Sequence, residues 1–79
     1  MNEQQSMVLK KLRNKLGITQ HELSERAKIS RPMYSCYETG IRELDKKNGE
    51  KLYRFFVEHV NNDELVLVLE ELLKERNIL

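Results

Sequence analysis

The side chains that most often perform catalysis or bind metals are few in this chain and lie far apart. His21, Cys36 and His59 fall in three different segments, without the close spacing that metal ligands need. The sequence contains no glycine-rich phosphate loop, and the acidic pair Glu70-Glu71 stands among residues typical of a solvated surface. We therefore expect a binding protein that is not an enzyme and that has no cofactor and no metal.

The single cysteine indicates the compartment. Cys36 has no partner for an intramolecular disulfide, which is typical of a reducing cytosol. The longest apolar run, Leu65 to Leu69, is much shorter than the ~20 residues that cross a bilayer. Residues 1–5 are too polar for a signal peptide. We expect a soluble, cytoplasmic protein with no membrane partner, and a redox switch at Cys36 is the alternative to an inert thiol.

Charge is distributed unevenly along the 79 residues. Residues 1–54 contain 12 Lys and Arg against 7 Asp and Glu, a net charge of +5. Residues 55–79 contain 2 against 6, a net charge of −4. The basic front half suits a polyanionic partner, whereas phosphates would repel the acidic back half. The alternative is an ordinary spread of solvated charge.

Two short helices joined by a tight turn are predicted in the middle of the chain. Thr19-Gln20-His21-Glu22 has the form of a capping box, so a helix begins at Thr19. Ser30 is a second N-cap, and its hydroxyl should bond to Met33 because Pro32 has no N–H. This next helix ends at Glu38, before the turn at Gly40. Such a pair is the arrangement that places the second helix in the major groove of DNA.

Apolar spacing and punctuation predict three further helices. The first covers residues 5–16. Another enters at Asn48-Gly49 after a polar loop over residues 41–47, and the last runs from about Asp63 to Arg76. We therefore expect residues 1–79 to form one all-α domain, a compact five-helix bundle.

The motifs resemble the helix-turn-helix domain of the phage repressor and Cro class, often called the Xre family. The resemblance rests on four segments, Leu12-Arg13, Leu16-Gly17-Ile18-Thr19-Gln20-His21-Glu22-Leu23-Ser24, Ala27-Lys28-Ile29-Ser30-Arg31 and Tyr37-Glu38-Thr39-Gly40. It covers about residues 5–60. The resemblance implies a lambda-repressor-like bundle that binds double-stranded DNA.

The resemblance also implies a role for each matching residue. The implied base contacts are Arg31, Pro32, Ser35 and Cys36, where Pro32 or Met33 could meet a thymine methyl. The implied phosphate contacts are Thr19, Gln20, Met33, Thr39 and Arg42. Arg13 and Glu38 match an internal ion pair of the family, and the alternative is two exposed charges that contribute little.

Arg31 is the predicted specificity residue. A guanidinium at the first base-reading position can bond to both O6 and N7 of guanine. The alternative is a phosphate contact, which adds affinity without sequence information.

The sequence departs from the family pattern in two places. Lys28 stands where many members have glycine, and a left-handed backbone would cost a lysine roughly 1 kcal/mol. The loop after Gly40 has Ile41 at an often basic position, and Glu43 and Asp45 would repel phosphates. The second phosphate clamp is therefore only a partial match.

The last helix has more apolar residues than one core stripe needs. We expect Leu65, Val68, Leu69 and Leu72 to form a homodimer interface in residues 62–79, and burial in the chain's own core is the alternative. The function expected from these features is transcription regulation, most simply repression from a palindromic operator. A protein-interaction module of antitoxin-like or bridging type, acting through the acidic last helix, is the alternative.

Overall fold

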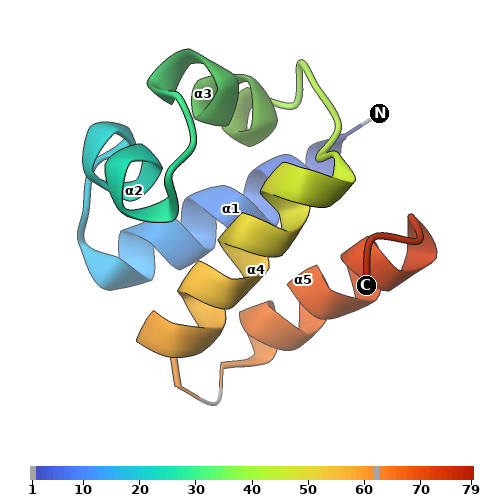
Figure 1. The fold of residues 1–79 in the computed structure, drawn as a ribbon. Coiled ribbons are helices and arrows are strands. Elements are labelled where there is room, and N and C mark those ends of the chain that lie inside the picture. The colour runs from blue at the N-terminus through green and yellow to red at the C-terminus, as the bar shows by residue number, and fades with distance from the viewer. Residues whose placement is uncertain (1, 62) are drawn as a thin grey trace.

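The computed structural model describes residues 2–61 and 63–79 and contains five α-helices in these ranges. They are α1 (Glu3–Leu16), α2 (Gln20–Ala27), α3 (Arg31–Thr39), α4 (Lys46–His59) and α5 (Glu64–Glu75). In Figure 1, α1 runs behind α4, α5 lies below them, and α2 and α3 form a separate layer at the upper side. The predicted all-α, five-helix bundle is confirmed.

Local capping chemistry explains where α2 and α3 begin. The Thr19 hydroxyl accepts a hydrogen bond from the Glu22 N–H at 3.1 Å, and the Thr19 N–H donates back to the Glu22 carboxylate at 3.4 Å. The Ser30 hydroxyl accepts from the Met33 N–H at 3.3 Å. Each cap satisfies an N–H that the first turn of a helix leaves without a partner. Both predicted caps are confirmed.

The entry to α4 was predicted wrongly. The helix begins at Lys46, not at Asn48-Gly49, because Asp45 is the N-cap and its carboxylate accepts from the Asn48 N–H at 2.7 Å. The same carboxylate accepts from the Tyr37 hydroxyl at 3.0 Å, so the cap is also anchored to α3. The loop after Gly40 is therefore shorter than predicted.

The core consists of apolar side chains from all five helices and from the segments between and after them. Its fully buried members include Leu9 and Leu12 of α1, Leu23 of α2, Tyr34 of α3 and Phe56 of α4. Burial of apolar surface is the main favourable term in the folding of a domain this small. Among the described helices, none has the length and apolar character of a bilayer-crossing span.

Gln5 is a buried polar residue that joins α1 to the loop before α4. Its side-chain N–H₂ donates to the Tyr37 carbonyl at 3.0 Å and to the Arg42 carbonyl at 2.8 Å. Its side-chain oxygen accepts from the Leu44 N–H at 2.9 Å and from the Arg76 guanidinium. One side chain therefore satisfies backbone groups that a buried loop would otherwise leave unpaired.

Gly49 lets the end of the chain close over α4. A Cβ at this position would lie 3.1 Å and 3.3 Å from two Ile78 methyl carbons and 3.3 Å from Leu73 Cδ2. We expect Gly49→Val to destabilise the protein by about 1 to 3 kcal/mol through overpacking, measured by urea unfolding. Lys47→Val, at an exposed position of the same helix, controls for the helix propensity of valine. Equal losses in the two variants would contradict this explanation.

Candidate nucleic-acid interface

The turn between α2 and α3 fixes the orientation of α3. Lys28 has φ 61° and ψ 47°, a left-handed conformation, and its N–H donates to the Glu25 carbonyl at 3.2 Å. Ile29 follows with its side chain 7% exposed and its N–H donating to the Ser24 carbonyl at 2.9 Å. The left-handed residue reverses the chain within three residues, and Ile29 anchors the turn in the core.

Replacing Lys28 with glycine should stabilise the protein. A left-handed backbone costs a residue with a Cβ roughly 1 to 2 kcal/mol, and glycine adopts it freely. Part of this gain is offset because glycine makes the unfolded chain more flexible. We expect Lys28→Gly to raise the free energy of unfolding by about 0.5 to 1 kcal/mol in urea unfolding. The Lys28 side chain is exposed, and the backbone carbonyl of residue 28 still accepts from Lys51 Nζ in the variant. A lower free energy of unfolding in the variant would contradict the proposed backbone strain.

One face of α3 is buried and the other is open to solvent. Tyr34, Tyr37 and Glu38 point into the protein and are 0%, 1% and 1% exposed. The residues predicted to read bases lie elsewhere on the helix: Arg31 and Pro32 are exposed, and Ser35 and Cys36 are half-buried. Figure 1 shows α3 at the upper edge of the molecule, and Arg31 and Pro32 at its start are open to solvent.

A bidentate ion pair holds α3 against α1. Arg13 Nε donates to Glu38 Oε2 at 2.9 Å, and Arg13 Nη2 donates to Glu38 Oε1 at 2.7 Å. Arg13 Nη1 also donates to the Ile18 carbonyl at 2.9 Å, just before α2. Burial acts to raise the pKa of the Glu38 carboxyl, but the hydrogen bonds and charge of Arg13 outweigh it and hold that pKa below its ordinary value. Arg13 therefore ties α1 to α3 and to the segment just before α2.

The start of α2 presents a second group of predicted contacts. Thr19 is exposed and Gln20 is half-buried in the first turn of the helix. Free N–H groups and the positive end of the helix dipole favour an anion at such a position. The Thr19 hydroxyl oxygen accepts the capping bond but keeps its hydrogen to donate. The site has the chemistry of a phosphate contact.

Two of the predicted phosphate contacts have no free donor. The Met33 N–H is taken by the Ser30 cap, and its side chain is apolar and packs against the core. The Thr39 hydroxyl donates within its own helix, to the Ser35 carbonyl at 2.8 Å and the Cys36 carbonyl at 3.3 Å. In this structure both donors are engaged within α3, and the two residues remain predicted contacts.

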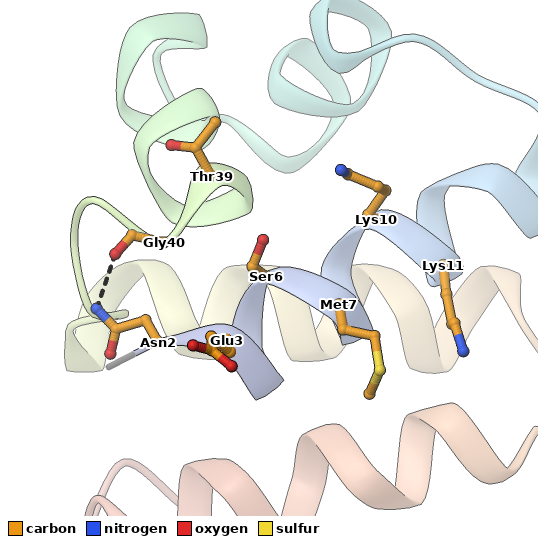
Figure 2. Close-up of a pocket in the computed structure, with 8 residues that line it drawn as sticks. All are labelled: Asn2, Glu3, Ser6, Met7, Lys10, Lys11, Thr39 and Gly40. Carbon is orange, nitrogen blue, oxygen red and sulfur yellow. Dashed lines mark hydrogen bonds between the residues drawn. The ribbon is translucent and has the colours of Figure 1, made fainter.

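A hollow of about 430 Å³ separates the first half of α1 from the end of α3 (Figure 2). The Ser6 hydroxyl in it donates to the Glu38 carbonyl, and the Asn2 side chain donates to the Gly40 carbonyl at 3.0 Å. Lys10 extends from α1 toward the side on which α3 lies. Asn2 and Ser6 thus help to close the end of α3, whereas Glu3, Lys10 and Lys11 are exposed.

Two cations near Arg42, which are Lys46 and Lys47, were not predicted from the sequence. Arg42 is exposed, as a phosphate contact requires, and Lys46 and Lys47 are exposed in the first turn of α4. Reading residues 41–47 as a loop hid the fact that both lysines stand at a helix N-terminus. The signal that could have revealed them is Asp45, three residues before Asn48, an N-cap spacing.

The residues with catalytic or metal-binding potential have ordinary surroundings. His21 pairs with Glu25 at 3.2 Å on the exposed face of α2, and His59 stacks on Phe55 with ring centroids 4.3 Å apart. Within residues 2–61 and 63–79, no three His, Cys, Asp or Glu side chains gather as metal ligands would.

The predicted dimer residues of the last helix divide into two groups. Leu69 and Leu72 are 0% and 5% exposed and belong to the core of this chain, so we correct their assignment to an interface. The reason is that α5 packs on both α1 and α4, which cover two sides of its wide apolar surface. Leu65 and Val68 are half-buried. Leu67, 61% exposed, is the apolar residue that α5 presents most openly.

Comparison with known proteins agrees with this geometry. A helix-turn-helix family model matches residues 9–56, more than half of the chain, from α1 through α2, the turn and α3 into α4. No curated protein and no solved structure gives a significant match. The matched span contains the buried ion pair, both helix caps and the open face of α3. The chain belongs to the helix-turn-helix family of the phage repressor and Cro class.

Proposed function

We propose that this protein is a sequence-specific, double-stranded DNA-binding transcription regulator that represses by occupying a palindromic operator as a homodimer. The observation that carries the proposal is the exposure of Arg31 and its neighbours on α3, while Tyr34, Tyr37 and Glu38 anchor the opposite face. A helix held from behind and open in front can enter a major groove without rearrangement. Such a regulator acts in the cytoplasm.

The proposed contacts lie at exposed or half-buried positions, which supports them. Arg31, Pro32, Ser35 and Cys36 face the base edges from α3. Thr19 and Gln20 bind phosphate at the start of α2, and Arg42 binds phosphate beyond the end of α3. These phosphate contacts on either side fix the position of α3 along the duplex. The base contacts then read the sequence. Residues 1–79 act as one DNA-binding domain, and residues 62–79 contribute to its core and to self-association.

Selection of bound sites from a random DNA pool tests the proposal. We expect one enriched, two-fold symmetric site, bound about a thousandfold more tightly than a scrambled duplex. On logarithmic axes, the plot of affinity against salt concentration should have a negative slope of about 0.9 for each phosphate contacted. Equal affinity for the selected and scrambled duplexes, or binding that does not respond to salt, would contradict the proposal.

A protein-interaction module acting through the acidic last helix is the second candidate. The exposed carboxylates of α5, Glu64, Glu71 and Glu75, favour it. Reversing their charge separates the two functions. A DNA-binding regulator keeps its selected site in this variant, whereas an interaction module loses its partner.

A further inference from the structure

One side of α1 faces the end of α3. Ser6, Lys10 and Arg13 follow the spacing i, i+4 and i+7, which places them along one stripe of the helix. The Ser6 hydroxyl donates to the Glu38 carbonyl, and the Arg13 guanidinium donates to the Glu38 carboxylate. Lys10 therefore stands between two side chains that both bond to α3.

Lys10 differs from its two neighbours on this stripe because its charge is open to solvent. Ser6 and Arg13 are half-buried, whereas Lys10 is exposed. Within residues 2–61 and 63–79, none of the ion pairs involves Lys10. Its side chain lines the hollow in Figure 2 and extends toward the side on which α3 lies. A cation in this position is available to a ligand outside the chain.

The predicted phosphate contacts lie on both sides of Lys10. Thr39, at the end of α3, lines the same hollow as Lys10. In the other direction along α1, Arg13 donates to the Ile18 carbonyl at 2.9 Å, just before the phosphate contacts proposed at the start of α2. Phosphates follow one another every ~3.4 Å of the duplex axis along one strand. A strand that meets both the start of α2 and the end of α3 therefore has phosphates beside Lys10.

We propose that the DNA interface extends onto α1, where Lys10 binds a phosphate of the strand that passes from the start of α2 to the end of α3. The inference rests on the proposed function, because it needs a duplex in contact with α3. A lysine ammonium is a compact charge that binds a phosphate whatever the neighbouring base. Lys10 is thus a positioning residue, which holds the duplex in register while α3 reads the bases.

The acidic residue of the hollow leaves this contact intact. Glu3 stands seven residues before Lys10, which is about 10 Å along α1. This distance exceeds the screening length of ~8 Å at physiological salt. A phosphate beside Lys10 therefore feels the lysine far more strongly than the carboxylate.

A purely structural role for Lys10 makes different predictions. A cation near the last turn of α3 interacts favourably with the negative end of the helix dipole, without any DNA. Such a role would appear in the stability of the free protein. A phosphate contact would appear in the salt dependence of DNA binding.

Lys10→Ala and Lys11→Ala, each made in the full chain, form a matched pair of variants. Both remove one exposed lysine from α1, but one residue turns the helix by about 100°, and Lys11 points away from α3 in Figure 2. For the selected duplex, Lys10→Ala should reduce the logarithmic slope of affinity against salt by about 0.9, and the affinity by about fivefold at roughly 0.15 M salt. Lys11→Ala should leave both near the wild-type values. Lys10→Arg should restore both, because it keeps the charge.

Site selection and urea unfolding complete the test. Both alanine variants should select the wild-type site and unfold at the same urea concentration, because Lys10 contacts neither the bases nor the core. The inference is overturned if Lys10→Ala has the same salt slope as Lys11→Ala, or if it selects a different site. A Lys10→Ala variant that unfolds at lower urea concentration but keeps the wild-type slope assigns Lys10 to the structural role.

The failure of the proposed function has a separate signature. A wild type that binds duplex DNA but selects no site removes the proposed function. The comparison of Lys10→Ala with Lys11→Ala on a scrambled duplex then still decides the inference, since a phosphate contact needs no particular sequence. A wild type that selects one site, with equal slopes for the two variants, removes the inference alone.

Discussion

Arg13→Met should destabilise the protein by about 3 to 5 kcal/mol, because it leaves the buried carboxylate of Glu38 without its counter-charge. Glu38 is 1% exposed, and two of the three hydrogen bonds from Arg13 go to it. A domain of this size has roughly 4 to 12 kcal/mol of stability, so a large part of it is lost. Urea unfolding followed by circular dichroism measures the change.

The double variant Arg13→Met, Glu38→Leu separates the charge effect from lost packing. Removing both partners leaves no uncompensated charge, so the double variant should be more stable than Arg13→Met alone. Lys74→Met breaks the exposed Glu70–Lys74 pair and should have little effect. A double variant as unstable as the single one would show that the pair matters through shape rather than charge.

The effect of Arg13→Met should depend on pH with a definite sign. Because the folded pKa of Glu38 is lowered, the pair stabilises the protein fully above the unfolded-state pKa. This stability is lost as the pH falls through the lower, folded pKa. The difference between the wild type and the variant should therefore narrow below the ordinary glutamate pKa of 4.5. A constant difference at acid pH would contradict the role of charge.

The parts of the fold that could be predicted depend on neighbouring residues. The Thr19 and Ser30 caps were correct because each hydroxyl bonds to an N–H three residues away. A left-handed backbone at Lys28 was raised by the family resemblance, because many members have glycine there, and the structure has φ 61° at this residue. Gln5 was missed because its partners, including the Tyr37 carbonyl, lie more than thirty residues away in the sequence. Helical spacing does place Gln5 on the stripe of Leu9 and Leu12, but it does not identify the groups to which a buried amide would bond.

The candidate site shows the same division between local and distant causes. The open face of α3 follows from the spacing of Tyr34 and Tyr37, which a helix places on its opposite side. Which apolar residues of α5 are buried could not be predicted in this way, because they cover a wide arc of the helix surface. Only the packing of α1 and α4 decides that Leu69 is covered while Leu67 stays exposed.

Arg31→Ala should reduce affinity for the selected operator by about 1 to 3 kcal/mol and abolish the preference for one base pair in each half-site. The physical reason is that a guanidinium at the exposed start of α3 can bond to two acceptors of one guanine at once. Site selection repeated with the variant measures both effects. Arg26→Ala, an exposed arginine of α2 outside the proposed contacts, should leave the preference unchanged.

Arg31→Lys distinguishes a base contact from a phosphate contact, because lysine keeps the charge but loses the planar pair of donors. At a phosphate, the lysine variant would bind nearly as well as the wild type and select the same sites. At a guanine, it should weaken the preference at that position, while the slope of affinity against salt stays the same. An alanine variant whose salt slope falls by about 0.9, with its preferred sites unchanged, would assign Arg31 to the DNA backbone and leave the reading of sequence to Ser35 and Cys36.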